Sequence, residues 1–154
     1  MKAANFFSNQ DLFSRLLELE LKRSLRYQSF ISILLVEAHA GGTEDGENHP
    51  LVSGKLALLI GEQLRETDLI GTYNENVLSV VLLHSDKTMA HRVAQRLGIL
   101  MSQYFGTSTS QGHFSIGGAC FPSNATDLSS LYQTAFIMLS EARSAGATEI
   151  HFSV

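Results

Sequence analysis

Residues 65–83, with the sequence RETDLIGTYNENVLSVVLL, decide the fold of this chain. Two mostly apolar runs, 68–73 and 78–83, flank the polar stretch 74–77, a pattern typical of a β-hairpin with a short polar tip. Upstream, the run SFISILLVE at 29–37 is apolar on both faces, which predicts a strand buried at the centre of a sheet. The sequence therefore predicts a sheet that contains a central strand and a hairpin.

Segments with the helical spacing of apolar residues alternate with these strands. The first predicted helix follows the capping residues 8–11, and the second spans 51–67. Asp86 caps a third helix, and a fourth spans 128–145, where Gly146 ends it.

Two more strands complete the pattern, at 113–121 and 148–154, and residues 38–50 form a loop rich in glycine and acid. The order of elements is helix, strand, helix, two strands, helix, strand, helix, strand. This order predicts one α+β domain in which helices cover a central sheet.

Composition excludes several classes of protein. The chain has 154 residues, and 44% of them are apolar. Its net charge of −4 disfavours a protein that binds the phosphates of nucleic acid. The longest apolar runs are only strand-sized, so we expect no membrane insertion. The single cysteine, Cys120, excludes an internal disulfide and a cysteine zinc site, and we expect a reducing, cytoplasmic environment.

In the first helix, four basic residues form a stripe that we interpret as a solvated face: Arg15, Lys22, Arg23 and Arg26.

Several motifs in order along the chain resemble the GGDEF domain of bacterial diguanylate cyclases. They are 9–13 with Leu16 and 26–27 in the first helix, DLIGTY at 68–73, SIGGA at 115–119, and Ala135, Leu139, Ala142, Arg143 and Gly146 in the last helix. We interpret residues 1–154 as a single degenerate GGDEF domain with a core at about 9–151.

The resemblance implies a central five-stranded, mostly antiparallel sheet with flanking helices, like the palm of class III nucleotide cyclases. In active members two such domains face each other, each holding GTP and magnesium, and they make cyclic di-GMP. The family's hairpin then reads Gly-Gly-Asp/Glu-Glu-Phe.

The hairpin of this chain departs from that pattern and reads Asn74, Glu75, Asn76, Val77 and Leu78. The first two residues restore side chains where glycines let a nucleotide approach the backbone. The third lacks the carboxylate that binds magnesium in the family, because an amide is neutral and accepts no proton at ordinary pH. We therefore expect no catalytic residues, and no cofactor except magnesium if GTP binding persists.

Other family positions are also altered. Glu37 ends the central strand as a vestigial metal ligand, but no phosphate-binding lysine follows it. The guanine-binding loop lacks the family's pattern, although His49-Pro50 lies there. Arg143 replaces the family's phosphate-binding lysine, and arginine can still hold phosphate.

A ligand site of the family is retained. Arg65 and Asp68 match its R-x-x-D product-inhibition motif, with residues 69–73 as the five-residue gap before the hairpin. The helix after the hairpin offers Arg96, or Arg92 one turn earlier, as a further phosphate ligand. The alternative is local, since the arginine at a helix end can pair with Asp68 simply to fix the turn.

Three functions remain open at this point. The first is a catalytically inactive regulatory domain that binds cyclic di-GMP through this motif and signals to a partner. The second is a ligand-free protein-interaction module or pseudo-enzyme that pairs with another protein. Self-association as a homodimer is a separate option that the sequence leaves open. The third is residual GTP binding or cyclase activity.

Overall fold

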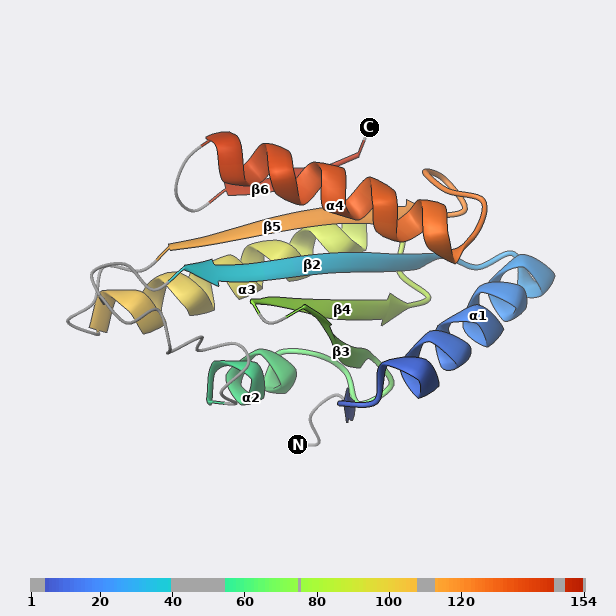
Figure 1. Cartoon of the computed structure of the whole chain (residues 1–154), viewed down its shortest axis with the longest axis horizontal. Helices are drawn as coiled ribbons and strands as arrows, with labels where there is room; N and C mark the ends of the chain where they lie inside the picture. Colours follow the sequence, from blue (N-terminus) through green and yellow to red (C-terminus); the bar gives the residue numbers. More distant parts are fainter. Residues whose placement is uncertain (1–4, 40–54, 75, 108–112, 146–148, 154) are drawn as a thin grey trace.

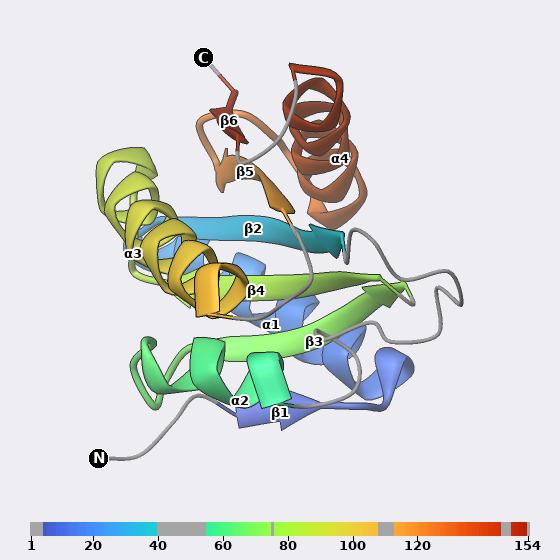
Figure 2. The same cartoon turned by 90° about the vertical axis from the view of Figure 1, so that its left-hand side faces the viewer.

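The computed structural model describes residues 5–39, 55–74, 76–107, 113–145 and 149–153. One mixed sheet of six strands, in the order β1-β3-β4-β2-β5-β6, forms the middle layer (Figure 1). Four helices lie against its two faces (Figure 2). The α+β architecture predicted from the sequence is confirmed.

The central strand is β2 (Ile31–His39), as the apolar run predicted. It pairs antiparallel with β4 (Val77–Leu83) on one side and with β5 (His113–Phe121) on the other. β3 (Leu69–Asn74) pairs antiparallel with β4 and completes the predicted hairpin. β6 (Glu149–Phe152) pairs parallel with β5 at one edge of the sheet.

The sixth strand is β1 (Asn5–Phe7), which the sequence did not predict. It pairs parallel with β3 at the other edge, with Asn5 opposite Leu69. Three residues are too few to show strand alternation, so only the tertiary pairing defines this strand. The predicted number of five strands was therefore one too low.

Two hydrophobic layers hold the domain together, one on each face of the sheet. α2 (Lys55–Glu62) and α3 (Lys87–Thr107) cover one face, and α1 (Gln10–Tyr27) and α4 (Leu128–Ala145) cover the other (Figure 2). Alternate residues of β2 serve the two layers, because successive strand side chains point to opposite faces. None of the described helices is long and apolar enough to cross a membrane.

α4 packs unusually close to β5, and this contact positions a residue of the site. A Cβ on Gly117 would collide with the backbone of α4 at Leu139 and Ala135. Only glycine permits this approach. Arg143 lies one turn beyond Leu139, so the same contact brings its side chain toward the sheet.

The second helix is shorter than predicted. It ends at Glu62 rather than Thr67, while residues 51–54 lie outside the described part of the chain. Leu64 continues the apolar spacing and is buried, which misled the prediction. The backbone turns instead, since the Asp68 carboxylate accepts from the backbone N–H of Arg65 at 3.0 Å.

Candidate functional site

One side-chain hydrogen bond braces the described residues of the hairpin tip. Asn74 Oδ1 accepts a hydrogen bond from the backbone N–H of Asn76 at 2.9 Å, and a register shift occurs between Thr72 and Asn74. Asn76 Oδ1 is buried and has no hydrogen-bond partner among the described residues. Val77 is fully buried, and Glu75 lies outside the described part of the chain.

The strand register brings three residues of the site into one row. Glu37 on β2 lies directly opposite Val77 on β4 and opposite Ser115 on β5. Side chains at directly opposed positions share a face of the sheet, about 5 Å apart. The one acid of this row therefore faces a hydrocarbon side chain at the fourth position of the hairpin motif.

An ion pair joins the two residues that the sequence singled out separately. Arg143 on α4 donates from Nε to Glu37 Oε1 at 2.8 Å and from Nη2 to Glu37 Oε2 at 3.2 Å. The Glu37 side chain is 8% exposed, whereas that of Arg143 is 42% exposed. The guanidinium also lies over the ring of Phe136, with 5.9 Å to its centroid. Both carboxylate oxygens thus face one fixed cation.

An aromatic cluster, which the sequence did not reveal, lies next to this pair. Tyr73 stacks on Tyr132 and on Phe136, with centroid separations of 5.7 and 5.9 Å. The Tyr132 hydroxyl is 2.6 Å from Ser79 Oγ on β4. Since Tyr73 immediately precedes the hairpin tip, the cluster fastens α4 to the base of the hairpin.

Burial raises the pKa of Tyr132 to about 12, and the hydrogen bond with Ser79 opposes this only in part. In the unfolded chain the phenol has its ordinary pKa of 10.0. The pKa of Tyr132 is higher in the folded than in the unfolded chain, so the protonated phenol stabilises the folded state. This contribution to the free energy of unfolding is complete below pH 10 and is lost as the pH rises toward about 12.

We expect up to roughly 2 kcal/mol of this alkaline loss to come from Tyr132. Urea unfolding followed by circular dichroism across this pH window measures it. Tyr132→Phe, which has no proton to lose, should show a shallower decline than the wild type. Parallel declines in the two proteins would contradict the assignment.

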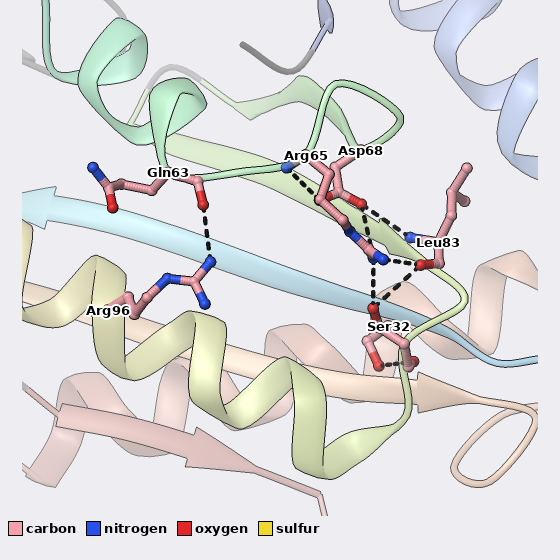
Figure 3. A network of polar contacts seen from close by, with 7 residues as sticks. Ser32, Gln63, Arg65, Asp68, Leu83 and Arg96 are labelled. Carbon is pink, nitrogen blue, oxygen red and sulfur yellow. Dashed lines mark hydrogen bonds and ion pairs between the residues drawn. The ribbon is translucent and has the colours of Figure 1, made fainter. Parts of the chain in front are cut away.

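The second cluster surrounds Asp68 (Figure 3). The carboxylate is 3% exposed and accepts from Arg65 Nη2 at 3.3 Å and from the backbone N–H of Leu83 at 3.3 Å. Arg65 Nη2 also donates to Leu83 O at 2.7 Å and to Ser85 Oγ at 2.9 Å. Ser85 O in turn accepts from Ser32 Oγ at 2.9 Å. The R-x-x-D pair thus ties the hairpin to the start of β2.

The two further arginines lie on α3. Arg96 Nη2 donates to the backbone carbonyl of Gln63 at 2.9 Å, which satisfies an acceptor just beyond the end of α2 (Figure 3). Arg92 is exposed one turn earlier on the same helix. The structure therefore brings Arg65 and Asp68 into contact and places Arg96 against the segment that leads to them.

The family model described as "Diguanylate cyclase, GGDEF domain" matches residues 52–149, well over half of the chain. The chain belongs to the GGDEF family. No curated protein matches it.

Solved GGDEF domains share its fold. The GGDEF domain of YfiN (TpbB) from Pseudomonas aeruginosa superposes with a TM-score of 0.79 at 21% identity, covering 96% of this chain and 91% of that one. The GGDEF domain of DgcB from Caulobacter crescentus, in complex with c-di-GMP, gives 0.78 at 14% identity, covering 94% and 90%. Diguanylate cyclase SiaD from P. aeruginosa, in complex with its activator SiaC, gives 0.78 at 18% identity, covering 94% and 58%.

Proposed function

We propose that this chain is a GGDEF domain without cyclase activity, which acts as a cytoplasmic regulatory module in bacterial signalling. The observation that carries the proposal is the ion pair of Glu37 with Arg143, opposite Val77. The resemblance makes Glu37 the counterpart of a metal ligand, and here a cation engages both of its oxygens. The departures at the hairpin, including Asn76, point the same way.

The residues present do not fit magnesium. Magnesium requires several oxygen ligands at about 2.0–2.1 Å in octahedral geometry. Glu37 is engaged by Arg143, Val77 supplies no oxygen, and Asn76 supplies only a neutral amide. The described residues contain no group of three or more His, Cys, Asp or Glu side chains that could hold a metal ion.

Incubation with GTP and either magnesium or manganese, followed by chromatography of the products, tests the proposal. We expect no cyclic di-GMP, because loss of a single acid–base group already costs about 10²–10⁴ in rate and here several groups are changed together. Accumulation of product would overturn the proposal and favour the alternative of residual cyclase activity. If the chain binds GTP but forms no cyclic di-GMP, it is a nucleotide-binding pseudo-enzyme.

A second candidate function is cyclic di-GMP binding at Arg65, Asp68 and Arg96. It is supported by the half-exposed guanidinium of Arg65 and by the neighbour DgcB, which was crystallised with this dinucleotide. The geometry sets one condition: the Asp68 carboxylate is already engaged, so a guanine edge must displace Arg65 from it. The local alternative, in which the pair only fixes the turn, needs no ligand.

Titration calorimetry with cyclic di-GMP separates these possibilities. If the site binds ligand, Arg65→Ala and Arg96→Ala should each weaken binding by at least about tenfold, since charge-assisted hydrogen bonds contribute ~1.5–3 kcal/mol. Arg92→Ala should then bind as the wild type does, because we favour Arg96 as the third ligand. No heat with the wild type, or unchanged binding by Arg65→Ala, would contradict the ligand role.

A ligand-independent role in protein interaction is the remaining alternative. The neighbour SiaD was crystallised with a partner protein, its activator SiaC, which shows one use of such a scaffold. Size-exclusion chromatography of the purified chain, with and without cyclic di-GMP, would report a homodimer. Assembly that the dinucleotide leaves unchanged would support this alternative over the ligand-dependent one.

A further inference from the structure

The side of α1 that points away from the sheet carries an unusual combination of side chains. Phe13, Leu17 and Leu21 bury the inner side of the helix. A continuous stripe on the opposite side has the spacing i, i+3, i+7, i+11 and i+14, and we call it the outward face of α1. Its members are Leu12, Arg15, Leu19, Arg23 and Arg26.

The segment from residue 6 to residue 30, which includes α1, holds most of the large apolar side chains that the described residues leave exposed. Leu12 is 49% exposed and Leu19 is 53% exposed. Of the ten large apolar side chains that the described residues leave exposed, six lie between residues 6 and 30, and the other four are divided among three helices. In Figure 1, α1 forms the outer border of the molecule and its C-terminal half extends past the ends of the strands. Four of these six side chains lie on α1, and Leu12 and Leu19 belong to its outward face. Exposed apolar side chains gathered on one helix favour an interaction site there.

Charge identifies the kind of partner that fits. α1 contains four basic and three acidic residues, a net charge of +1, while the whole chain has −4, so the remainder has −4 − (+1) = −5. Every charged member of the outward face is an arginine. Arg23 pairs with the neighbouring Glu20 at 3.3 Å, and neither Arg15 nor Arg26 has an ion pair with another described residue. Self-association through this face would place arginine against arginine, which is unfavourable.

We propose that the outward face of α1 docks an acidic amphipathic helix of a partner protein. Apolar residues of that helix would cover Leu12 and Leu19, and its flanking carboxylates would meet Arg15, Arg23 and Arg26. The stripe follows the spacing of one face of a straight helix, which is the kind of face that a second helix can cover. This inference concerns a surface separate from the hairpin, so it does not depend on whether the domain is catalytically active.

A lipid surface fits the face less well than a helix does. A helix that lies in a bilayer inserts a wide apolar side, but the wide apolar side of α1 is packed on the sheet. The outward face of α1 therefore lacks the wide apolar side that insertion into a bilayer requires.

Two synthetic helical peptides test the proposal. Both carry leucine at the a and d positions of each heptad, and the e and g positions are glutamate in one and lysine in the other. Calorimetry measures affinity, and circular dichroism reports any helix induced on binding. We expect the wild-type chain to bind the glutamate peptide at least about tenfold more tightly than the lysine peptide, since complementary charges select the partner.

Charge reversal then provides the decisive comparison. The triple variant Arg15→Glu, Arg23→Glu, Arg26→Glu should invert the preference, and Leu19→Ser should weaken binding of the glutamate peptide by about tenfold. Lys87→Glu, an exposed change on α3, should behave as the wild type. Thermal unfolding confirms that each variant is folded.

Three results would overturn the proposal. They are failure of the wild type to bind either peptide, equal affinity for both, and an unchanged preference in the triple variant. Binding to vesicles of phosphatidylcholine and phosphatidylglycerol, without binding to the glutamate peptide, would assign the face to lipid instead.

Discussion

Arg143→Met should destabilise the domain by roughly 2–3 kcal/mol, because it removes the guanidinium from a buried carboxylate. Methionine retains an unbranched apolar side chain but removes the guanidinium from both Glu37 and the ring of Phe136. The partly exposed position of Arg143 keeps the effect below that of a fully buried pair. Urea unfolding monitored by circular dichroism measures the difference in the free energy of unfolding.

A double-mutant cycle assigns this loss to the ion pair. Glu37→Gln removes the charge that needs a partner, so the combination with Arg143→Met should cost less than the two single changes added together. Arg92→Met, which removes an exposed arginine of α3, should stay within about 0.5 kcal/mol of the wild type. A similarly small effect of Arg143→Met would show that the ion pair does not hold α4 to β2.

Asp68→Ala has the larger expected effect, a loss of roughly 3–4 kcal/mol. The buried carboxylate accepts from the backbone N–H groups of Arg65 and Leu83, and both donors would lose their acceptor. The Arg65 guanidinium would lose its counter-charge in the same step. Shifts in the urea midpoint at constant slope would report this loss as one of stability.

Two variants bracket this result. Glu66→Ala removes an exposed acid of the same turn and should change stability by less than about 0.5 kcal/mol. Arg65→Ala should cost less than Asp68→Ala, since the arginine side chain is 52% exposed. If Asp68→Ala were as stable as the wild type, the carboxylate would be free to serve a ligand instead of the fold.

These expectations bear on how ligand binding is tested. A variant that unfolds loses ligand affinity for a trivial reason, so Asp68→Ala cannot by itself prove a dinucleotide site. Arg65→Ala and Arg96→Ala change side chains that are more exposed and are therefore better probes. A stability measurement on each variant separates lost affinity from lost structure.

Most elements of the fold could be predicted from local patterns. The strand at 29–37 and the hairpin around 74–77 follow from continuous apolar runs beside a polar tip, and α1, α3 and α4 follow from helical spacing and capping residues. The end of α2 could not be predicted, because Leu64 prolongs the apolar period beyond the point where Asp68 turns the backbone.

The candidate site could be predicted only one residue at a time. Glu37 and Arg143 were each recognised through family motifs, but they are 106 positions apart and their contact depends on the packing of α4. Arg65 and Asp68 are three positions apart, so their pairing was anticipated as one of two alternatives. Arg65 also donates to Leu83 and Ser85, which lie 18 and 20 positions later in the chain. No local sequence pattern indicates contacts over that separation.

The missing Cβ at Gly117 also bears on how a metal site could be designed into this chain. Since the backbone of α4 rests on β5, the separation between helix and sheet is set by main-chain contact and is insensitive to the side chains above it. Substitutions at Val77, Asn76 and Arg143 would then alter the chemistry beside Glu37 without changing the separation of helix and sheet. The scaffold at this site and the side chains mounted on it can therefore be changed independently of each other.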